Sequence, residues 1–255
     1  MEHRVVTCSA ALRRPARWRA LALLCLAPVA YAGPPYLTDD PQPTDYRHFE
    51  TYLYGSGNAN RAGSTAETGV DFNFGARPDL QLTAVAPIDY QRPAAGTGAT
   101  GLGNFELAAK YRFAHRERCG WDISTFPRWI LPSVAREVGA RHHALQLPIW
   151  LEKDYGRWST FGGAGITLQR GAGARDYALV GWAITRQVLP RLQLGAELFH
   201  RSADVPGGLA TTVLNAGMRY DFSEHYHLLG SSGPGIQNAT RTNAHSWYLG
   251  LLITR

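Results

Sequence analysis

From residue 46 to the C-terminus the chain consists of short segments in which apolar and polar residues alternate. The alternation is clearest over residues 103–113, where Phe105, Leu107 and Tyr111 alternate with Glu106 and Lys110. A strand with this period of two presents one apolar and one charged face. Segments of about ten residues with this alternation, separated by turn residues, are typical of a transmembrane β-barrel.

The pattern predicts an all-β fold, a transmembrane antiparallel barrel that occupies residues 46–255. We expect twelve strands, near residues 46–55, 66–76, 80–90, 103–114, 120–131, 143–154, 157–168, 175–187, 191–201, 210–221, 225–232 and 244–254. The number is even, as in other single-chain barrels of this kind.

Tight turns and longer loops alternate along this series of strands. The tight turns are predicted at 77–79, 115–118, 155–156, 189–190 and 223–224, and the longer loops at 56–65, 91–102, 132–142, 170–174, 202–209 and 231–243. Outer-membrane barrels have short periplasmic turns and longer extracellular loops. On that assignment, both termini lie in the periplasm.

Residues 1–32 have the three parts of a secretory signal peptide. Arginines 4, 13, 14, 17 and 19 precede an apolar run over residues 20–30, and Ala30-Tyr31-Ala32 forms a cleavage site of small residues. The apolar run is too short for the alternative, an uncleaved membrane anchor. Leu24 stands where a small residue would precede a lipidated Cys25, which argues against a lipoprotein. We expect cleavage after Ala32 and a Gram-negative-type outer-membrane location.

Charge and cysteine content then exclude several functional classes. Removing residues 1–32 takes away five arginines and one glutamate, and the remaining chain has a formal net charge of +2. This small charge does not indicate nucleic-acid binding. Cys119 is the only cysteine that remains, so a disulfide framework within one chain is excluded. We expect no cofactor and no metal.

A proline-rich acidic segment over residues 33–45 precedes the first predicted strand. It contains four prolines together with Asp39, Asp40 and Asp45. Because proline cannot donate a ladder hydrogen bond, this stretch is not expected to form a regular strand. Attraction to lumen cations could hold it inside the barrel as a plug; the alternative is a tether in the periplasm.

The polar faces of the strands predict the lining of the lumen. The inward positions are Glu50, Asp71, Asn73, Gln81, Asp89, Glu106, Lys110, Arg112, Gln146, Trp150, Glu152, Glu197, Asn215, Arg219 and Asp221. Both charge signs are present, so internal salt bridges are expected among them. Trp150 would offer a flat surface on which an apolar solute could stack.

Barrel width limits the function. Eight strands give a filled interior and 16–18 an open channel, so twelve predict a narrow, partly obstructed pore. The alternatives are a non-conducting structural or interaction barrel and a lipid hydrolase on the barrel wall. His200 and Ser202 are the nearest Ser/His pair for such a hydrolase. The histidines at 142–143 and 225–227 could ligate a metal, but ordinary polar positions explain them better.

Six stretches of the chain carry distinctive motifs: residues 33–41 (GPPYLTDDP), 46–50 (YRHFE), 103–112 (GNFELAAKYR), 147–156 (LPIWLEKDYG), 195–200 (GAELFH) and 220–229 (YDFSEHYHLL). Together they resemble the phenol-degradation MetA-pathway-like family of outer-membrane proteins. The resemblance covers nearly the whole chain after residue 32. It implies an outer-membrane channel or transporter and leaves the substrate open. We expect a channel for small, hydrophobic or aromatic solutes, and we expect no enzymatic activity because the residues carry no enzyme signature.

The expected partners are outer-membrane lipid, a small-molecule solute and the outer-membrane assembly machinery. Barrels of this type usually end on an aromatic residue that the assembly machinery reads, whereas this chain ends in Leu251-Leu-Ile-Thr-Arg255. The C-terminal signal therefore departs from the usual pattern.

Overall fold

The computed structural model describes residues 35–255 except Arg136, so the predicted signal peptide, residues 1–32, lies outside the described residues. The strands are β1 (Phe49–Asn60), β2 (Gly63–Arg77), β3 (Leu80–Pro93), β4 (Ala99–Leu102), β5 (Glu106–Ala114), β6 (Asp122–Thr125), β7 (Arg128–Ile130), β8 (His143–Tyr155), β9 (Trp158–Arg170), β10 (Tyr177–Leu189), β11 (Leu192–Arg201), β12 (Thr211–Asp221), β13 (Tyr226–Gln237) and β14 (His245–Thr254). The helix α1 covers Arg116–Cys119. No helix in the described part of the chain is long and apolar enough to cross a membrane.

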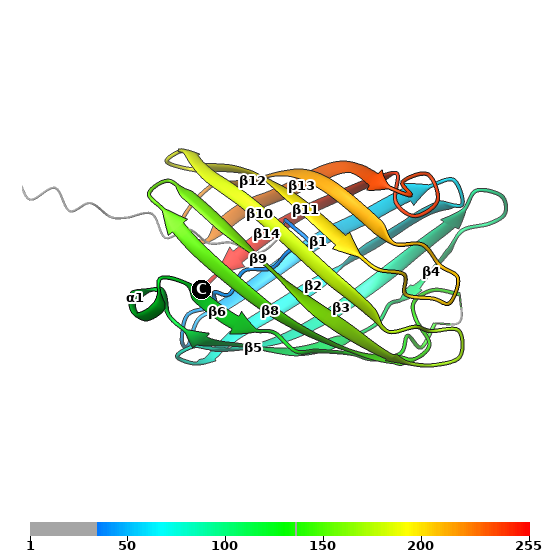
Figure 1. Ribbon diagram of the computed structural model, residues 1–255, viewed down its shortest axis with the longest axis horizontal. Coiled ribbons are helices and arrows are strands. Elements are labelled where there is room, and N and C mark those ends of the chain that lie inside the picture. Colours follow the sequence, from blue (N-terminus) through cyan, green and yellow to red (C-terminus); the bar gives the residue numbers. More distant parts are fainter. Residues whose placement is uncertain (1–34, 136) are drawn as a thin grey trace, which may run out of the picture.

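These strands form one antiparallel sheet that closes on itself (Figure 1). β1 pairs with β14, and β3 pairs with both β4 and β5. β8 likewise pairs with both β6 and β7. The fourteen strands therefore occupy twelve positions, two of them interrupted, which confirms the predicted twelve-stranded antiparallel barrel. Closure leaves no free sheet edge, so backbone groups pair within the wall.

The predicted loop over residues 56–65 is wrong. β1 and β2 continue through it, Asn58 pairs with Thr65, and only Arg61 and Ala62 form the turn. Gly, Asn and Ser suggest a loop locally, but ladder pairing with a neighbouring strand overrides weak strand propensity. For the same reason β13 extends to Gln237, beyond the predicted end at 232. The connection between β1 and β2, predicted to be one of the longer loops, is therefore as short as a tight turn.

The predicted strand over residues 120–131 is interrupted. β6 ends at Thr125 and β7 begins at Arg128, with Phe126 and Pro127 between them. Pro127 has no N–H to donate to a ladder, which accounts for the break. Phe126 is buried at the break, where it packs against Trp150.

The wall has an apolar outer face and a polar inner face. In β3, Leu82 is 46% exposed on the outside, whereas Gln81 and Thr83 next to it are both 5% exposed. We name the end with residues 78–79, 156–157 and 190–191 the turn end, and the opposite end the loop end. Exposed aromatic side chains gather near both ends: Phe49, Tyr111, Phe113, Tyr155, Trp158, Phe222 and Tyr226 near the turn end, and Tyr90, Phe105, Trp129 and Trp247 toward the loop end. Such belts match the two interfaces of a bilayer.

Candidate functional site: the barrel lumen and its N-terminal segment

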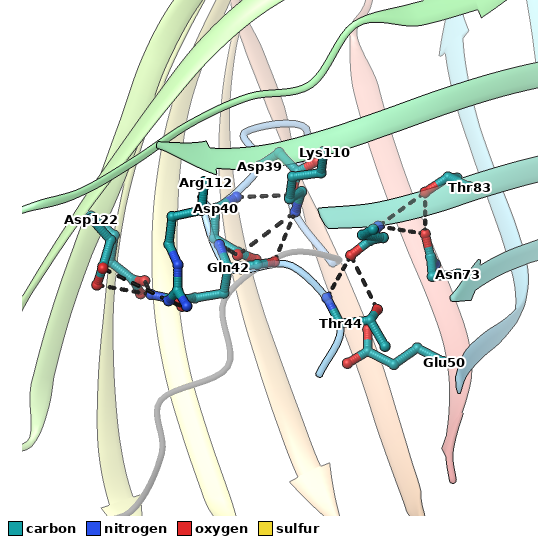
Figure 2. A network of polar contacts seen from close by, with 12 residues as sticks. Asp39, Asp40, Gln42, Thr44, Glu50, Asn73, Thr83, Lys110, Arg112 and Asp122 are labelled. Atoms are coloured by element: carbon teal, nitrogen blue, oxygen red, sulfur yellow. Dashed lines mark hydrogen bonds and ion pairs between the residues drawn. The ribbon is translucent and has the colours of Figure 1, made fainter. Parts of the chain in front are cut away.

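Residues 35–45, the N-terminal segment, lie inside the barrel and contact its inner wall (Figure 2). Thr38, Asp40 and Thr44 are almost completely buried there, with exposed fractions of 0%, 1% and 3%. The segment enters beside Gly75, where Tyr46 bridges to the end of β2 and the N–H of Arg47 donates to the Gly75 carbonyl at 2.8 Å.

The centre of the segment is held by a buried ion cluster. Lys110 Nζ on β5 lies 3.0 Å from Asp39 Oδ1 and 3.8 Å from Asp40 Oδ1, and it donates to the Gln42 carbonyl at 3.3 Å. The same nitrogen lies 4.9 Å from the ring centroid of Phe126. Burial raises the pKa of the Asp40 carboxyl well above its usual range, and Lys110 offsets part of that effect. A lysine this deeply buried needs such partners.

Gln42 connects the segment to the turn end of the wall. Its Nε2 donates to Asp122 Oδ2 at 3.0 Å and to Glu152 Oε2 at 2.9 Å. Its Oε1 accepts a hydrogen bond from Arg112, whose Nη2 also lies 2.8 Å from Asp79 Oδ1. One side-chain amide therefore joins β5, β6 and β8 to the segment.

A second amide holds the last part of the segment. Thr44 donates through its N–H and its Oγ1 to Gln81 Oε1 on β3, at 2.8 and 3.1 Å. Gln81 Nε2 in turn donates to Asn73 Oδ1 at 2.6 Å and to Thr83 Oγ1 at 3.0 Å. These contacts form the right-hand part of the network in Figure 2.

The first part of the segment packs against the opposite wall. The N–H of Thr38 donates to Glu197 on β11, which also accepts a hydrogen bond from Asn215 at 2.9 Å. Burial raises the pKa of the Tyr36 hydroxyl. The ring of Tyr36 fills a space left by glycines: a Cβ at Gly217 would lie 2.7 Å from its hydroxyl oxygen. A strand glycine thus marks a close approach, as the general rule predicts.

A cavity of about 590 Å³, the lumen cavity, lies between the N-terminal segment and the loop end. Tyr36, Asp39 and Gln42 of the segment line it on one side, and Val138 and Gly139 of the loop after β7 line it on the other. This volume falls in the range of small-molecule sites.

The predicted lumen residues lie on the inner wall in several groups. Lys110, Arg112, Glu152 and Glu197 contact the N-terminal segment, as described above. Glu106 Oε2 accepts from Arg128 Nε at 3.0 Å. Arg219 Nε donates to Asp221 Oδ1 at 2.8 Å, and His227 Nδ1 lies 2.7 Å from the same oxygen.

Trp150 and the three candidate plug residues differ in their surroundings. Trp150 is 2% exposed and packs with Phe126, and it also lines the lumen cavity. Asp39 and Asp40 face Lys110, whereas Asp45 is exposed and its carbonyl accepts from the N–H of His48. The structure thus brings two of the three acidic residues to a lumen cation.

His200 and Ser202 do not form a hydrogen bond with each other in the described part of the chain. His200 Nδ1 lies 2.8 Å from Thr212 Oγ1, and Ser202 Oγ accepts from the N–H of Ala178 at 2.9 Å. The described residues also contain no cluster of three or more His, Cys, Asp or Glu side chains that could hold a metal ion.

The sequence did not single out Thr38, Gln42, Asp122 or Arg128 as functional residues. Their roles depend on partners far along the chain; Gln42 and Glu152 are 110 residues apart. A sequence signal existed for the packing of this part of the segment, because three neighbouring strands carry inward glycines: Gly195 and Gly217 face Tyr36, and Gly181 faces Thr38. Glycine at such positions indicates that another part of the chain approaches the wall.

The fold matches solved outer-membrane barrels. The COG4313 outer membrane channel from Pseudomonas putida F1 superimposes with a TM-score of 0.68 at 12% identity, covering 85% of this chain and 98% of that one. The NanC porin gives 0.55 at 8% identity, with 80% and 99% covered. The KdgM porin, solved in complex with disordered oligogalacturonate, gives 0.53 at 10% identity, with 81% and 98% covered. No protein-family model matches the sequence, and no curated protein is significantly similar to it. These likenesses establish the fold of an outer-membrane β-barrel.

Proposed function

We propose that this protein is an outer-membrane channel for small solutes whose lumen is narrowed by its own N-terminal segment. The observation that carries the proposal is the reach of that segment across the lumen. Its residues contact β3, β5, β6 and β8 on one side and β11 and β13 on the other. A peptide bound on opposite walls obstructs the passage, while the lumen cavity remains free beyond it.

The solved neighbours with TM-scores above 0.5 support this proposal, since they include a channel and two porins. Membership of the MetA-pathway-like family, suggested by residues 33–41 and 103–112, is part of the proposal, as is a solute with an apolar or aromatic body. The aromatic lining of the lumen cavity supports such a solute, because Tyr52, Trp150 and Tyr248 border it. The short turns support a periplasmic turn end, with both termini in the periplasm.

Deletion of residues 34–44 from the mature chain tests the plug. We expect a higher single-channel conductance in planar bilayers than for the full mature chain, because contacts on both walls are removed. At high salt the ratio of the two conductances, both measured at the same salt concentration, should fall, because screening weakens ion pairs between segment and wall that water can reach, such as Lys110 with Asp39.

Folding of the deletion variant is checked by heat-modifiable gel mobility. A folded variant with unchanged conductance contradicts the plug. If neither form conducts, the protein is the alternative, a non-conducting structural barrel.

A further inference from the structure

The lumen cavity has an excess of acidic side chains among its described lining residues. The acidic residues that line it are Asp39, Asp40, Glu50, Glu67, Asp71, Asp89 and Glu106, and the basic ones are Lys110, Arg128 and Arg219. Each of these three cations already contacts a carboxylate: Lys110 contacts Asp39, Arg128 contacts Glu106, and Arg219 contacts Asp221.

The excess is concentrated on one side, which we name the acidic wall: Glu67, Asp71, Asp89 and Glu106. These residues come from three neighbouring strands, β2, β3 and β5. Glu67 and Asp89 are directly opposite in the β2–β3 register, and Asp71 and Glu106 both pair with Val85, on either side of it. Like charges placed directly opposite destabilise a sheet. Nothing in the pairing of these strands requires carboxylates at these positions.

The acidic wall has more carboxyl groups than neighbouring cations, since Arg128 alone acts on Glu67, Asp71 and Glu106 among the described lining residues. Glu67 accepts from the hydroxyl of Tyr54 at 2.5 Å, and Asp71 accepts from the Asn73 amide at 3.0 Å. Asp89 Oδ1 is buried and has no hydrogen-bond partner among the described residues. Within that part of the chain, Glu67, Asp71 and Asp89 form no ion pair, and only Glu106 has one, with Arg128.

Aromatic rings border the cavity beside the acidic wall. Tyr54 on β1 and Tyr248 on β14 are stacked, with ring centroids 6.1 Å apart and planes tilted by 8°. Tyr52 and Trp150 also line the cavity. Aromatic faces attract organic cations, most strongly where water is excluded, and rings with carboxylates form the recognised pockets for ammonium groups.

We propose that the lumen cavity binds organic cations, in particular an ammonium group attached to an apolar or aromatic body. The ammonium group lies against the acidic wall, and the apolar body lies against Tyr54, Tyr248 and Trp150. Cation binding at this site would define the class of solute that the channel carries, and in this respect it rests on the proposed channel function. The free volume of about 590 Å³ accommodates a molecule of this size.

Calorimetric titration of the folded, detergent-solubilised mature chain tests the proposal. Three probes of similar size but different charge are compared: benzyltrimethylammonium, benzyl alcohol and benzoate. We expect the cation to bind at least about tenfold more tightly than the other two, because several carboxylates act on it in a site of low dielectric. Equal affinity for the three probes overturns the proposal.

Two sets of variants assign the binding to this cavity. Glu67→Gln with Asp71→Asn keeps the side-chain volumes and should weaken cation binding about tenfold or more. The matched control, Glu117→Gln with Glu224→Gln, removes the same charge at exposed turn-end positions outside the cavity and should leave binding unchanged. Tyr248→Leu should weaken binding of the cation while keeping the charges. Equal losses in the acidic-wall variant and the control mean that overall charge, and not this cavity, attracts the cation.

The outcome is separable from that of the conductance test. Binding is measured with the N-terminal segment in place and requires no conduction. If the chain binds the cation but does not conduct, the binding site is supported and the channel function is rejected. If the chain conducts but binds the three probes equally, the channel function is supported and the solute class is rejected.

Discussion

Single glycines on the inner wall determine where the N-terminal segment packs. At Gly217 the three heavy atoms nearest to the place that a Cβ would occupy all belong to the Tyr36 side chain, between 2.7 and 2.8 Å away. Real Cβ contacts are not this short, so any side chain at 217 competes with the Tyr36 ring for the same space. The fit between these two residues is therefore steric, whereas Asp39 and Lys110 are joined by charge.

The first prediction concerns this contact. Gly217→Ala should destabilise the barrel by about 1–3 kcal/mol through overpacking, measured by urea unfolding in lipid vesicles. Gly230→Ala, where the nearest heavy atom would be 3.8 Å from the new Cβ, is the matched control and should change little. In the background of Tyr36→Ala the cost of Gly217→Ala should largely disappear, because the two residues are coupled. A cost that persists without the Tyr36 ring would place the strain elsewhere.

At the scale of elements, the period of two places alternate side chains of each strand on the outer face and in the lumen. In β8, Leu147 and Ile149 are exposed on the outside, at 39% and 45%, whereas Trp150 and Glu152 are buried inside. Not all inward positions are equivalent, however. Gln146 and Gln81 both border the lumen cavity, but Gln81 is 5% exposed and holds Thr44 through its amide oxygen.

The second prediction uses this difference within β8. Leu147→Arg should cost about 2–4 kcal/mol if this position lies near the bilayer midplane and faces lipid. Gln146→Arg, the neighbouring inward position, should cost much less because the new charge faces a polar lumen. Urea titration in lipid vesicles measures both. Equal costs at the two positions are incompatible with an outer face in contact with lipid.

Gln81→Arg should differ from Gln146→Arg, because position 81 is packed against the N-terminal segment and does not tolerate a new charge. The substitution removes the acceptor of Thr44 and places a second cation near Lys110 in a packed network. We expect it to release the segment and raise single-channel conductance, whereas Gln146→Arg should not.

At the scale of the whole molecule, the two ends of the barrel differ in their connections. The turns at 78–79, 156–157 and 190–191 have two residues each, whereas the loop after β7 spans residues 131–142 and lines the lumen cavity. The two-residue turn at Arg61 and Ala62 lies at the loop end, so turn length alone does not mark an end of the barrel.

The third prediction concerns orientation in the membrane. Epitope tags inserted after Gly98 and after Gly207, both at the loop end, should be accessible to antibody on intact cells. A tag between Pro78 and Asp79, at the turn end, should become accessible only after the outer membrane is permeabilised. Labelling of the turn-end tag alone on intact cells would reverse the proposed orientation.

The period of two by itself determined the fold class and the number of barrel strands, and it predicted which side chains of a strand share a face. It could do so because alternation is a local property: residues i and i+2 share a face in any strand. The acidic segment precedes strands that carry inward-facing cations, which also made the attraction of Asp39 and Asp40 to Lys110 foreseeable, since charge acts without detailed geometry.

Only the tertiary structure decided which strands extend, where the segment packs and where the free cavity lies. The composition around Asn58 and Thr65 favours a loop, yet the two residues pair with each other and remain in β1 and β2. Gln42 reaches Glu152 across 110 residues of sequence, and Tyr36 fits against Gly217 only once the barrel has closed. Contacts of this kind depend on the curvature and width of the closed wall, which are set by the pairing of all strands together.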